Sequence, residues 1–102
     1  LVILDPPSFT RTKERLRDAL RGYKEIHLRA AGLLGNNGLL ATFCCSHHVD
    51  AALFSDVITS AAADAHRILR RIAVYGQSPD HPVLPVIPET EYLKGYAYEV
   101  AR

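Results

Sequence analysis

The sequence predicts a single α/β domain with a mostly parallel sheet whose last strand is antiparallel. Two short apolar runs, 1–4 and 39–45, are each followed by a longer stretch in which apolar residues recur every three or four positions. A short apolar run is typical of a buried strand, and the longer pattern is typical of an amphipathic helix. Two consecutive strand–helix units favour parallel strands joined by right-handed crossovers. The 102 residues suffice for one domain, 1–102.

The first predicted strand, over 1–4, ends at Asp5-Pro6-Pro7, because proline lacks the N–H that a strand ladder uses. A helix is expected from Thr12 to about Leu34, with Thr10 or Thr12 able to cap its start. It ends before Gly35-Asn36-Asn37-Gly38, whose residues tolerate left-handed backbone. Its apolar stripe is predicted to hold Leu16, Leu20, Tyr23, Ile26 or His27, Ala30 and Leu34.

The remaining elements are expected in the order strand, helix, strand, loop and strand. Their ranges are 39–45, 48–67, 68–75, 76–91 and 92–100. The loop has a proline at every third position from Pro79 to Pro88, a period that suits an extended segment. The second helix should bury Ala52, Leu53, Val57, Ile58 and Ala61. His27 and His66, on the two helices, are predicted to be surface or boundary residues, and His81, in the loop, to be structural.

Composition matches an ordinary soluble protein, with 48% hydrophobic residues, 23% charged residues and a net charge of +1. Residues 1–30 hold seven Lys and Arg against four acids, a basic bias well below that of a dedicated nucleic-acid module. No apolar run approaches the length that crosses a membrane. Two adjacent cysteines do not make a disulfide framework. We therefore expect a cytoplasmic protein. Because it lacks Met and begins inside an apparent strand, we expect a piece of a longer chain.

Ligands of open parallel sheets bind beyond the carboxyl ends of the strands. Two chemically rich segments stand there, Asp5-Pro6-Pro7-Ser8-Phe9 after the first strand and Cys44-Cys45-Ser46-His47-His48 after the second. Asp5 can simply cap the turn. Alternatively, on a loop that two prolines make rigid, its carboxylate can bind a planar base while Phe9 offers a stacking face. The two segments together predict a binding site at this edge.

The two cysteines also allow two interpretations. Both can be small buried apolar residues, or one can be a nucleophile at the end of the strand. Adjacent strand residues point to opposite faces, so at most one thiol should face the site. A zinc site is disfavoured, because zinc ligands are normally spaced more widely than in Cys-Cys-x-His-His. We expect no metal.

The motifs resemble a known family. Asp5-Pro6-Pro7-Ser8-Phe9 resembles motif IV of class I S-adenosylmethionine-dependent methyltransferases, and Thr42-Phe43-Cys44-Cys45-Ser46 resembles motif VI of RNA cytosine-5 methyltransferases. Further segments resemble the large-subunit ribosomal RNA cytosine-5 methyltransferase I family, in order and over nearly the whole chain. They are Arg21-Gly22-Tyr23-Lys24-Glu25-Ile26, Asp80-His81-Pro82-Val83 and Tyr92-Leu93-Lys94-Gly95.

The resemblance implies the C-terminal half of a Rossmann-like methyltransferase domain that uses S-adenosyl-L-methionine and acts on RNA, most simply ribosomal RNA. It places the nucleophile at Cys45 and a packing residue at Cys44. Asp5 would hold the pyrimidine and, with Pro6, border the methyl donor. Pro6, Pro7, Phe9 and Ser46 would contact the substrate. Lys24 and nearby Arg residues would either contact phosphate or form a solvated helix face.

The glycine-rich donor loop and the acidic residue of the family pattern that binds the donor's ribose have no match in the chain. We therefore expect the chain alone neither to bind the donor well nor to turn over. Its first strand should leave an open sheet edge, covered by another segment or by a second copy in a homodimer. Two other functions stay open. One is methylation of another target, such as a guanine amino group or a protein amide, and the other is RNA binding without catalysis.

Overall fold

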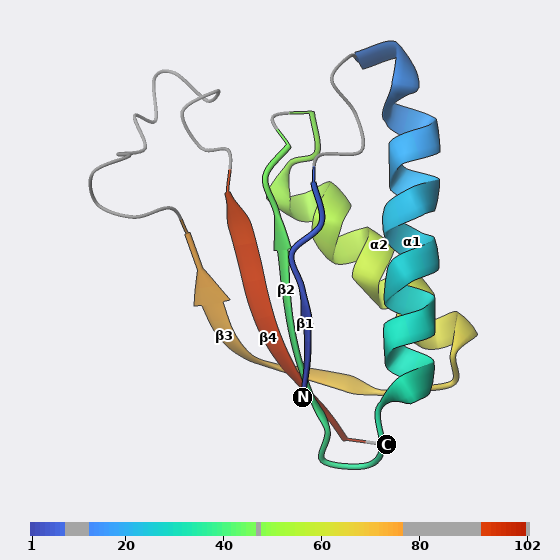
Figure 1. The fold of residues 1–102 in the computed structure, drawn as a ribbon, viewed down its shortest axis with the longest axis vertical. Coiled ribbons are helices and arrows are strands. Elements are labelled where there is room, and N and C mark those ends of the chain that lie inside the picture. Colours follow the sequence, from blue (N-terminus) through green and yellow to red (C-terminus); the bar gives the residue numbers. More distant parts are fainter. Residues whose placement is uncertain (8–12, 47, 77–92, 102) are drawn as a thin grey trace.

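The computed structural model describes residues 1–7, 13–46, 48–76 and 93–101. In this part of the chain, four strands form one sheet and two helices pack against it (Figure 1). The elements are β1 (Val2–Leu4), a 3-10 turn (Lys13–Arg15), α1 (Leu16–Leu33), β2 (Leu39–Cys44), α2 (Ala51–Asp64), β3 (Leu69–Tyr75) and β4 (Lys94–Val100). The predicted order of elements is therefore confirmed.

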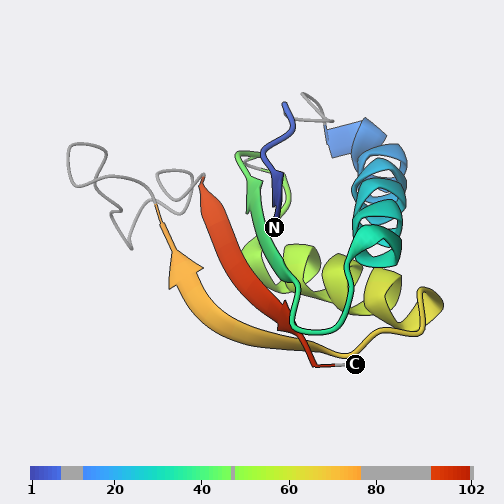
Figure 2. The ribbon, with the colours of Figure 1, turned by 60° about the horizontal axis from the view of Figure 1, so that its bottom comes forward.

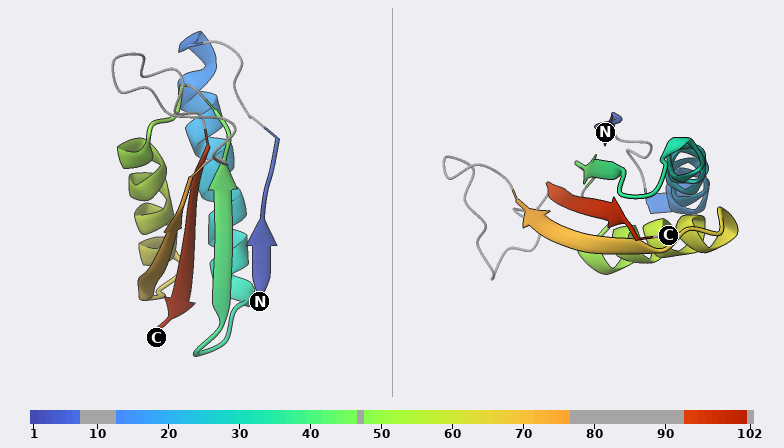
Figure 3. Two further views of the ribbon diagram at one scale, coloured as in Figure 1. Left: turned by 90° about the vertical axis from the view of Figure 1, so that its left-hand side faces the viewer. Right: turned by 90° about the horizontal axis from the view of Figure 1, so that it is seen from below.

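The strands follow the order β1-β2-β4-β3 across the sheet. β1 pairs with β2 in parallel, whereas β4 is antiparallel to both of its neighbours, β2 and β3. The first three strands consequently run in one direction and the last runs against them, as Figure 3 shows from the side. This confirms the predicted fold class. It also shows that β4 inserts between β2 and β3, which the sequence analysis had not anticipated.

Both helices lie on the same face of the sheet (Figures 2 and 3). On β1, Val2 and Leu4 pack against the core, while the side chain of Ile3 between them is 63% exposed. Leu39 at the start of β2 is 40% exposed as well. Among the described residues, no helix covers the opposite face of the sheet. β1 forms one edge of this sheet, as predicted.

Helix α1 begins at Leu16, after a 3-10 turn, and not near Thr12 as predicted. The N-cap position is Arg15, which makes no side-chain capping bond, whereas Thr10 and Thr12 lie outside the described residues. The helix ends at Leu33. In the turn that follows, Asn37 adopts a left-handed φ of 65°, which asparagine tolerates and which agrees with the predicted stop.

The stripe of α1 that faces the core differs from the prediction at a histidine. Its buried residues are Ala19, Tyr23, His27, Ala30 and Ala31. His27 is only 2% exposed, so its assignment as a surface or boundary residue is wrong. Burial is tolerated because both ring nitrogens have polar partners, which removes most of the cost of taking the ring out of water. His66 is exposed, but it lies beyond the end of α2 and has a φ of 57°, so it is not a helical residue.

Helix α2 is shorter than predicted at both ends. Asp50 caps it by accepting a hydrogen bond from the N–H of Leu53 at 2.8 Å, so the helix starts at Ala51 and not at His48 or Val49. It ends at Asp64 and not at Arg67. Its buried residues are Phe54, Ile58, Ala61 and Ala62. The prediction therefore omitted Phe54 and wrongly included Ala52, which is exposed.

An aromatic cluster joins the two helices to β4. Phe54 meets Tyr23 edge-on at 6.1 Å between ring centroids and stacks on Tyr96 at 5.8 Å. Arg71 of β3 lies 4.0 Å from the centroid of the Tyr96 ring. Aromatic pairs and a cation over a ring each add stabilisation beyond the burial of their area. This cluster therefore fixes α2 and β4 relative to one another.

On the opposite face, Gly95 lies between two aromatic side chains. It pairs with Phe43 of β2 on one side and with Tyr75 of β3 on the other. The two rings lie 6.1 Å apart. A Cβ atom built on Gly95 would approach the Phe43 ring to 2.5 Å. Only glycine therefore lets the two rings close over β4 without a shift of Phe43.

We expect Gly95→Ala to destabilise the chain by about 1–3 kcal/mol, since the new methyl group must displace an aromatic ring. The free energy of unfolding from urea titration measures this. Gly32→Ala is a matched control, because its Cβ would meet nothing within 4 Å and the residue lies in α1, where alanine is the better helix former. Equal stability of the Gly95→Ala protein and the unchanged protein would contradict the expected clash.

Candidate functional site

The candidate site lies at the edge of the sheet where β1 and β2 end. These two parallel strands are neighbours, with Leu4 in register with Thr42, so their carboxyl ends lie side by side (Figure 1). Asp5 directly follows β1 and is exposed, and Cys45 directly follows β2. The structure thus brings the two predicted catalytic residues to one edge, on adjacent strands.

The two cysteines are buried to different extents. Cys44 is completely buried among core residues, whereas Cys45 is partly exposed. Burial alternates along β2 and continues into the next residues, so that Ser46 is again buried, at 1% exposure. Of the two thiols, only that of Cys45 is accessible to solvent, in agreement with the expected alternation; its role at the site stays a prediction.

The turn between β2 and α2 is held by three hydrogen bonds. The backbone N–H of His48 donates to Ser46 Oγ at 3.2 Å, and Asp50 caps the helix that follows. The Lys94 ammonium at the start of β4 donates to the carbonyl oxygen of Ser46 at 2.6 Å. Ser46 therefore anchors the turn through its side chain and its backbone.

Lys94 is a residue of this site that the sequence analysis did not single out. It pairs with Cys44 across β2 and β4, and it is only 5% exposed. A lysine at the first position of a strand whose other residues are mostly apolar or aromatic is the signal that could have identified it, because charged side chains are rarely buried without a partner.

Beneath the site, a buried histidine connects α1 to β2. His27 Nδ1 lies 2.6 Å from the carbonyl oxygen of Tyr23, so it must carry the proton and donate. Nε2 then accepts from the Thr42 hydroxyl at 2.5 Å. Burial lowers the pKa of His27 below its ordinary value of 6.5, and the bond to the Tyr23 carbonyl opposes this in part. The ring is therefore neutral and holds one tautomer.

The other residues predicted to contact the substrate differ in how the structure describes them. Pro6 is half-buried and Pro7 is exposed, both directly after Asp5. Phe9 and His47 lie outside the described residues, as does His81. Lys24 is part of an ion pair with Asp64 of α2, with a 2.8 Å separation, so its ammonium helps to join the helices. It lines a groove between the helices together with Arg17 and Arg21.

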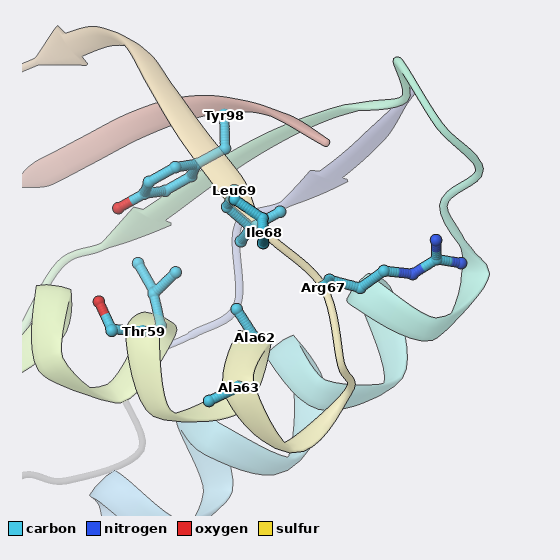
Figure 4. Close-up of a pocket in the computed structure, with 8 residues that line it drawn as sticks. Thr59, Ala62, Ala63, Arg67, Ile68, Leu69 and Tyr98 are labelled. Atoms are coloured by element: carbon cyan, nitrogen blue, oxygen red, sulfur yellow. The ribbon is translucent and has the colours of Figure 1, made fainter. Parts of the chain in front are cut away.

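A second groove, with a volume of about 280 Å³, opens between the C-terminal part of α2 and the start of β3 (Figure 4). Its polar groups come from Thr59, Arg67 and Tyr98. Burial raises the pKa of the Tyr98 hydroxyl. A hydrogen bond from Arg71 lowers this pKa and so opposes part of the shift. Because β3 runs parallel to β1 and β2, its first residue lies at the amino ends of these strands, whereas Asp5 and Cys45 lie at their carboxyl ends. This groove is therefore separate from the candidate site.

Within the described part of the chain, no three His, Cys, Asp or Glu side chains are grouped so that they could hold a metal ion. The described helices also include none with the length and apolar character needed to span a bilayer.

Two known proteins are close in sequence to this chain. Ribosomal RNA large subunit methyltransferase I of Aliivibrio fischeri strain MJ11 is 44% identical over 100 residues, which cover 98% of this chain and 25% of that protein. The protein of the same name from Escherichia coli O1:K1 is 43% identical over 100 residues, which again cover 98% of this chain and 25% of that protein. The chain resembles one segment of ribosomal RNA large subunit methyltransferase I. It spans about a quarter of the length of these relatives. No protein-family model matches it.

Solved structures share the fold. A candidate methyltransferase complexed with SAH superposes with a TM-score of 0.79 at 21% identity, over 97% of this chain and 26% of that one. A candidate SAM-dependent methyltransferase from Streptococcus mutans gives a TM-score of 0.78 at 19% identity, over 97% of this chain and 25% of that one. The resemblance to ribosomal RNA large subunit methyltransferase I and to a Rossmann-like methyltransferase fold, predicted from the motifs, is thus confirmed.

Proposed function

We propose that this chain is the target-binding, C-terminal half of the catalytic domain of an RNA methyltransferase that uses S-adenosyl-L-methionine. The similarity to ribosomal RNA large subunit methyltransferase I, 44% over 98% of the chain, supports the reaction class and a ribosomal RNA substrate. The rest of the domain, with most of the donor-binding residues, comes from another part of a longer protein, consistent with the 25% coverage of the relatives.

We propose further that the methylated atom is C5 of a cytosine. The observation that carries this step is the contrast between the two thiols, with Cys44 wholly buried and Cys45 partly exposed beside the end of β1. A mobile or flipped-out base could reach Cys45, while a thiol inside the core could not act as a nucleophile.

In the proposed reaction, the Cys45 thiolate forms a bond to C6 of the cytosine, which makes C5 nucleophilic. C5 would then take the methyl group from the sulfonium of the donor, whose S–CH3 bond breaks and leaves a neutral thioether. A base removes the C5 proton, the C5–C6 double bond forms again and the bond between sulfur and C6 breaks. Only the last step regenerates the Cys45 thiolate, so the complete sequence of steps leaves the enzyme unchanged.

Asp5 fits a role beside this reaction because it is exposed at the carboxyl end of β1 and free of any ion pair among the described residues. Its carboxylate would accept hydrogen bonds from the pyrimidine. With Pro6 it would also border the donor. Pro7 and Phe9 would complete the substrate contacts, whereas Ser46, predicted as a further contact, is 1% exposed and would support the turn instead. Lys24, next to Arg17 and Arg21, would contact RNA phosphate.

An RNA oligonucleotide that carries 5-fluorocytosine at the target position tests this function. Fluorine replaces the C5 proton that must leave, so methyl transfer should stop at the covalent adduct. We expect the full-length enzyme that contains this sequence to give a donor-dependent protein–RNA adduct, and peptide mass spectrometry should locate it on Cys45. Methyl transfer to RNA without any such adduct would favour an amino-group target bound through the Asp5-Pro6-Pro7 loop.

The open edge of the sheet has a consequence for the isolated chain. β1 pairs with β2 on one side, and its other side forms the edge of the described sheet. We propose that another segment of the longer protein covers this edge, or that a second copy of the chain does so when that segment is missing.

A further inference from the structure

A buried ammonium group contacts the turn that follows the candidate nucleophile. Lys94 occupies the first position of β4, in register with Cys44 at the end of β2. Its side chain is only 5% exposed. A buried charge is costly unless strong polar contacts compensate for it. A residue of this kind is therefore expected to have a specific role that an apolar residue of the same size could not fill.

The ammonium forms a short bond to the turn that carries Cys45. Lys94 Nζ donates to the carbonyl oxygen of Ser46 at 2.6 Å, and hydrogen bonds from a charged donor are stronger than those between neutral groups. Ser46 follows Cys45 directly, and its Oγ accepts from the N–H of His48. The bond thus links β4 to the peptide next to the thiol.

We infer that Lys94 is a positioning residue for Cys45, an inference that rests on the function proposed above. β2 ends at Cys44, so the pairing of the described strands stops one residue before Cys45. Lys94 supplies a restraint from the neighbouring strand by holding the adjacent carbonyl. The restraint keeps the residue before Ser46, Cys45, at the end of β2, beside the end of β1 that Asp5 follows.

The inference separates two properties of the lysine side chain. Its aliphatic stem is buried, and methionine can fill the same space. Its charged donor holds the Ser46 carbonyl, a role that methionine cannot fill but arginine can. Lys94→Met and Lys94→Arg therefore distinguish a positioning role from a packing role.

The test measures the rate at which the full-length enzyme forms the covalent adduct with 5-fluorocytosine RNA in the presence of saturating donor. We expect Lys94→Met to slow adduct formation by roughly 10-fold to 100-fold, in line with the cost of misplacing a reacting group by about 1 Å. Donor affinity from calorimetry and the melting temperature should stay close to those of the unchanged enzyme. Lys94→Arg should recover most of the rate.

Arg29→Met is the matched control, because Arg29 is a surface cation whose ion pair with Glu25 lies within α1. It should leave the adduct rate unchanged. An adduct rate for Lys94→Met within about twofold of the unchanged enzyme overturns the inference, and so does a loss that runs parallel with lost donor affinity and folding. If Cys45→Ala still methylates RNA, the proposed function fails instead, so the two failures are distinguishable.

Discussion

Cys45→Ala in the full-length enzyme is expected to lower kcat/KM for RNA methylation by roughly 10⁴-fold or more, because removal of a covalent nucleophile leaves only binding and orientation to assist the reaction. The partly exposed thiol is the one that a base can reach. Donor affinity should stay unchanged, since the substitution removes a single sulfur atom at the end of β2. Methyl incorporation from labelled donor into RNA measures the effect.

Cys44→Ala is the natural control, as it removes the neighbouring thiol by the same chemical change. Cys44 is fully buried in the core, so the expected cost is about 1 kcal/mol of stability through a small cavity and not a loss of turnover. If both variants keep their activity, the cytosine C5 mechanism is excluded. If Cys44→Ala alone abolishes methylation in a folded enzyme, the assignment of the nucleophile is wrong.

The order of elements and the difference between the two cysteines were predictable from the sequence. Both depend on local periodicity, since alternation along a strand decides which side chains enter the core. Cys44 and Cys45 differ by one position, and this alone places one thiol in the core and leaves the other partly exposed. The ends of the helices were less predictable, because Arg15 starts α1 without a capping side chain.

The position of β4 and the burial of Lys94 were not predictable in this way. Insertion of β4 between β2 and β3 depends on pairing between strands that are far apart in the sequence, which no local pattern encodes. Lys94 becomes part of the site only through this insertion, because it reaches the carbonyl of Ser46 from the neighbouring strand. The part of the candidate site that the sequence analysis missed is thus the part that long-range pairing creates.

His27 was misjudged for a related reason. On the sequence, it shares a helical stripe with apolar residues, and either Ile26 or His27 could face the core. The partners that make burial of His27 acceptable lie on different elements, namely the Tyr23 carbonyl of α1 and the Thr42 hydroxyl of β2. Once these partners are in place, the ring becomes a buried polar link between α1 and the strand that leads to Cys45.

The second large effect is expected at this link. We expect His27→Ala to destabilise the chain by about 3 kcal/mol, since it creates a cavity beside Phe54, 5.6 Å away by ring centroids, and removes the ring's hydrogen bonds to the buried Thr42 hydroxyl and the Tyr23 carbonyl. Urea unfolding at pH 7.5 measures this. A loss within the range of an ordinary surface substitution, about ±0.5 kcal/mol, would contradict a structural role for the buried ring.

The same histidine should make stability depend on pH. Burial holds the pKa of His27 below 6.5 in the folded chain, while the unfolded chain takes up a proton near 6.5. Between these two values the unfolded state binds more protons, so the free energy of unfolding falls as the pH is lowered below about 6.5. Above that pH the full stability is present, because His27 is then neutral in both states.

Unfolding free energies of the unchanged chain and of His27→Leu, measured from pH 7.5 down to pH 5, isolate this effect. The leucine variant cannot titrate at this position, so its free energy of unfolding should fall less steeply with decreasing pH. The difference in slope corresponds to at most one proton taken up on unfolding. His66→Asn is the matched control, since His66 is exposed and asparagine tolerates its φ of 57°. Equal slopes for His27→Leu and the unchanged chain would mean that His27 is protonated as readily in the folded chain as in the unfolded one. That result would contradict the two hydrogen bonds of the buried ring, because Nε2 can accept from the Thr42 hydroxyl only when the ring is neutral.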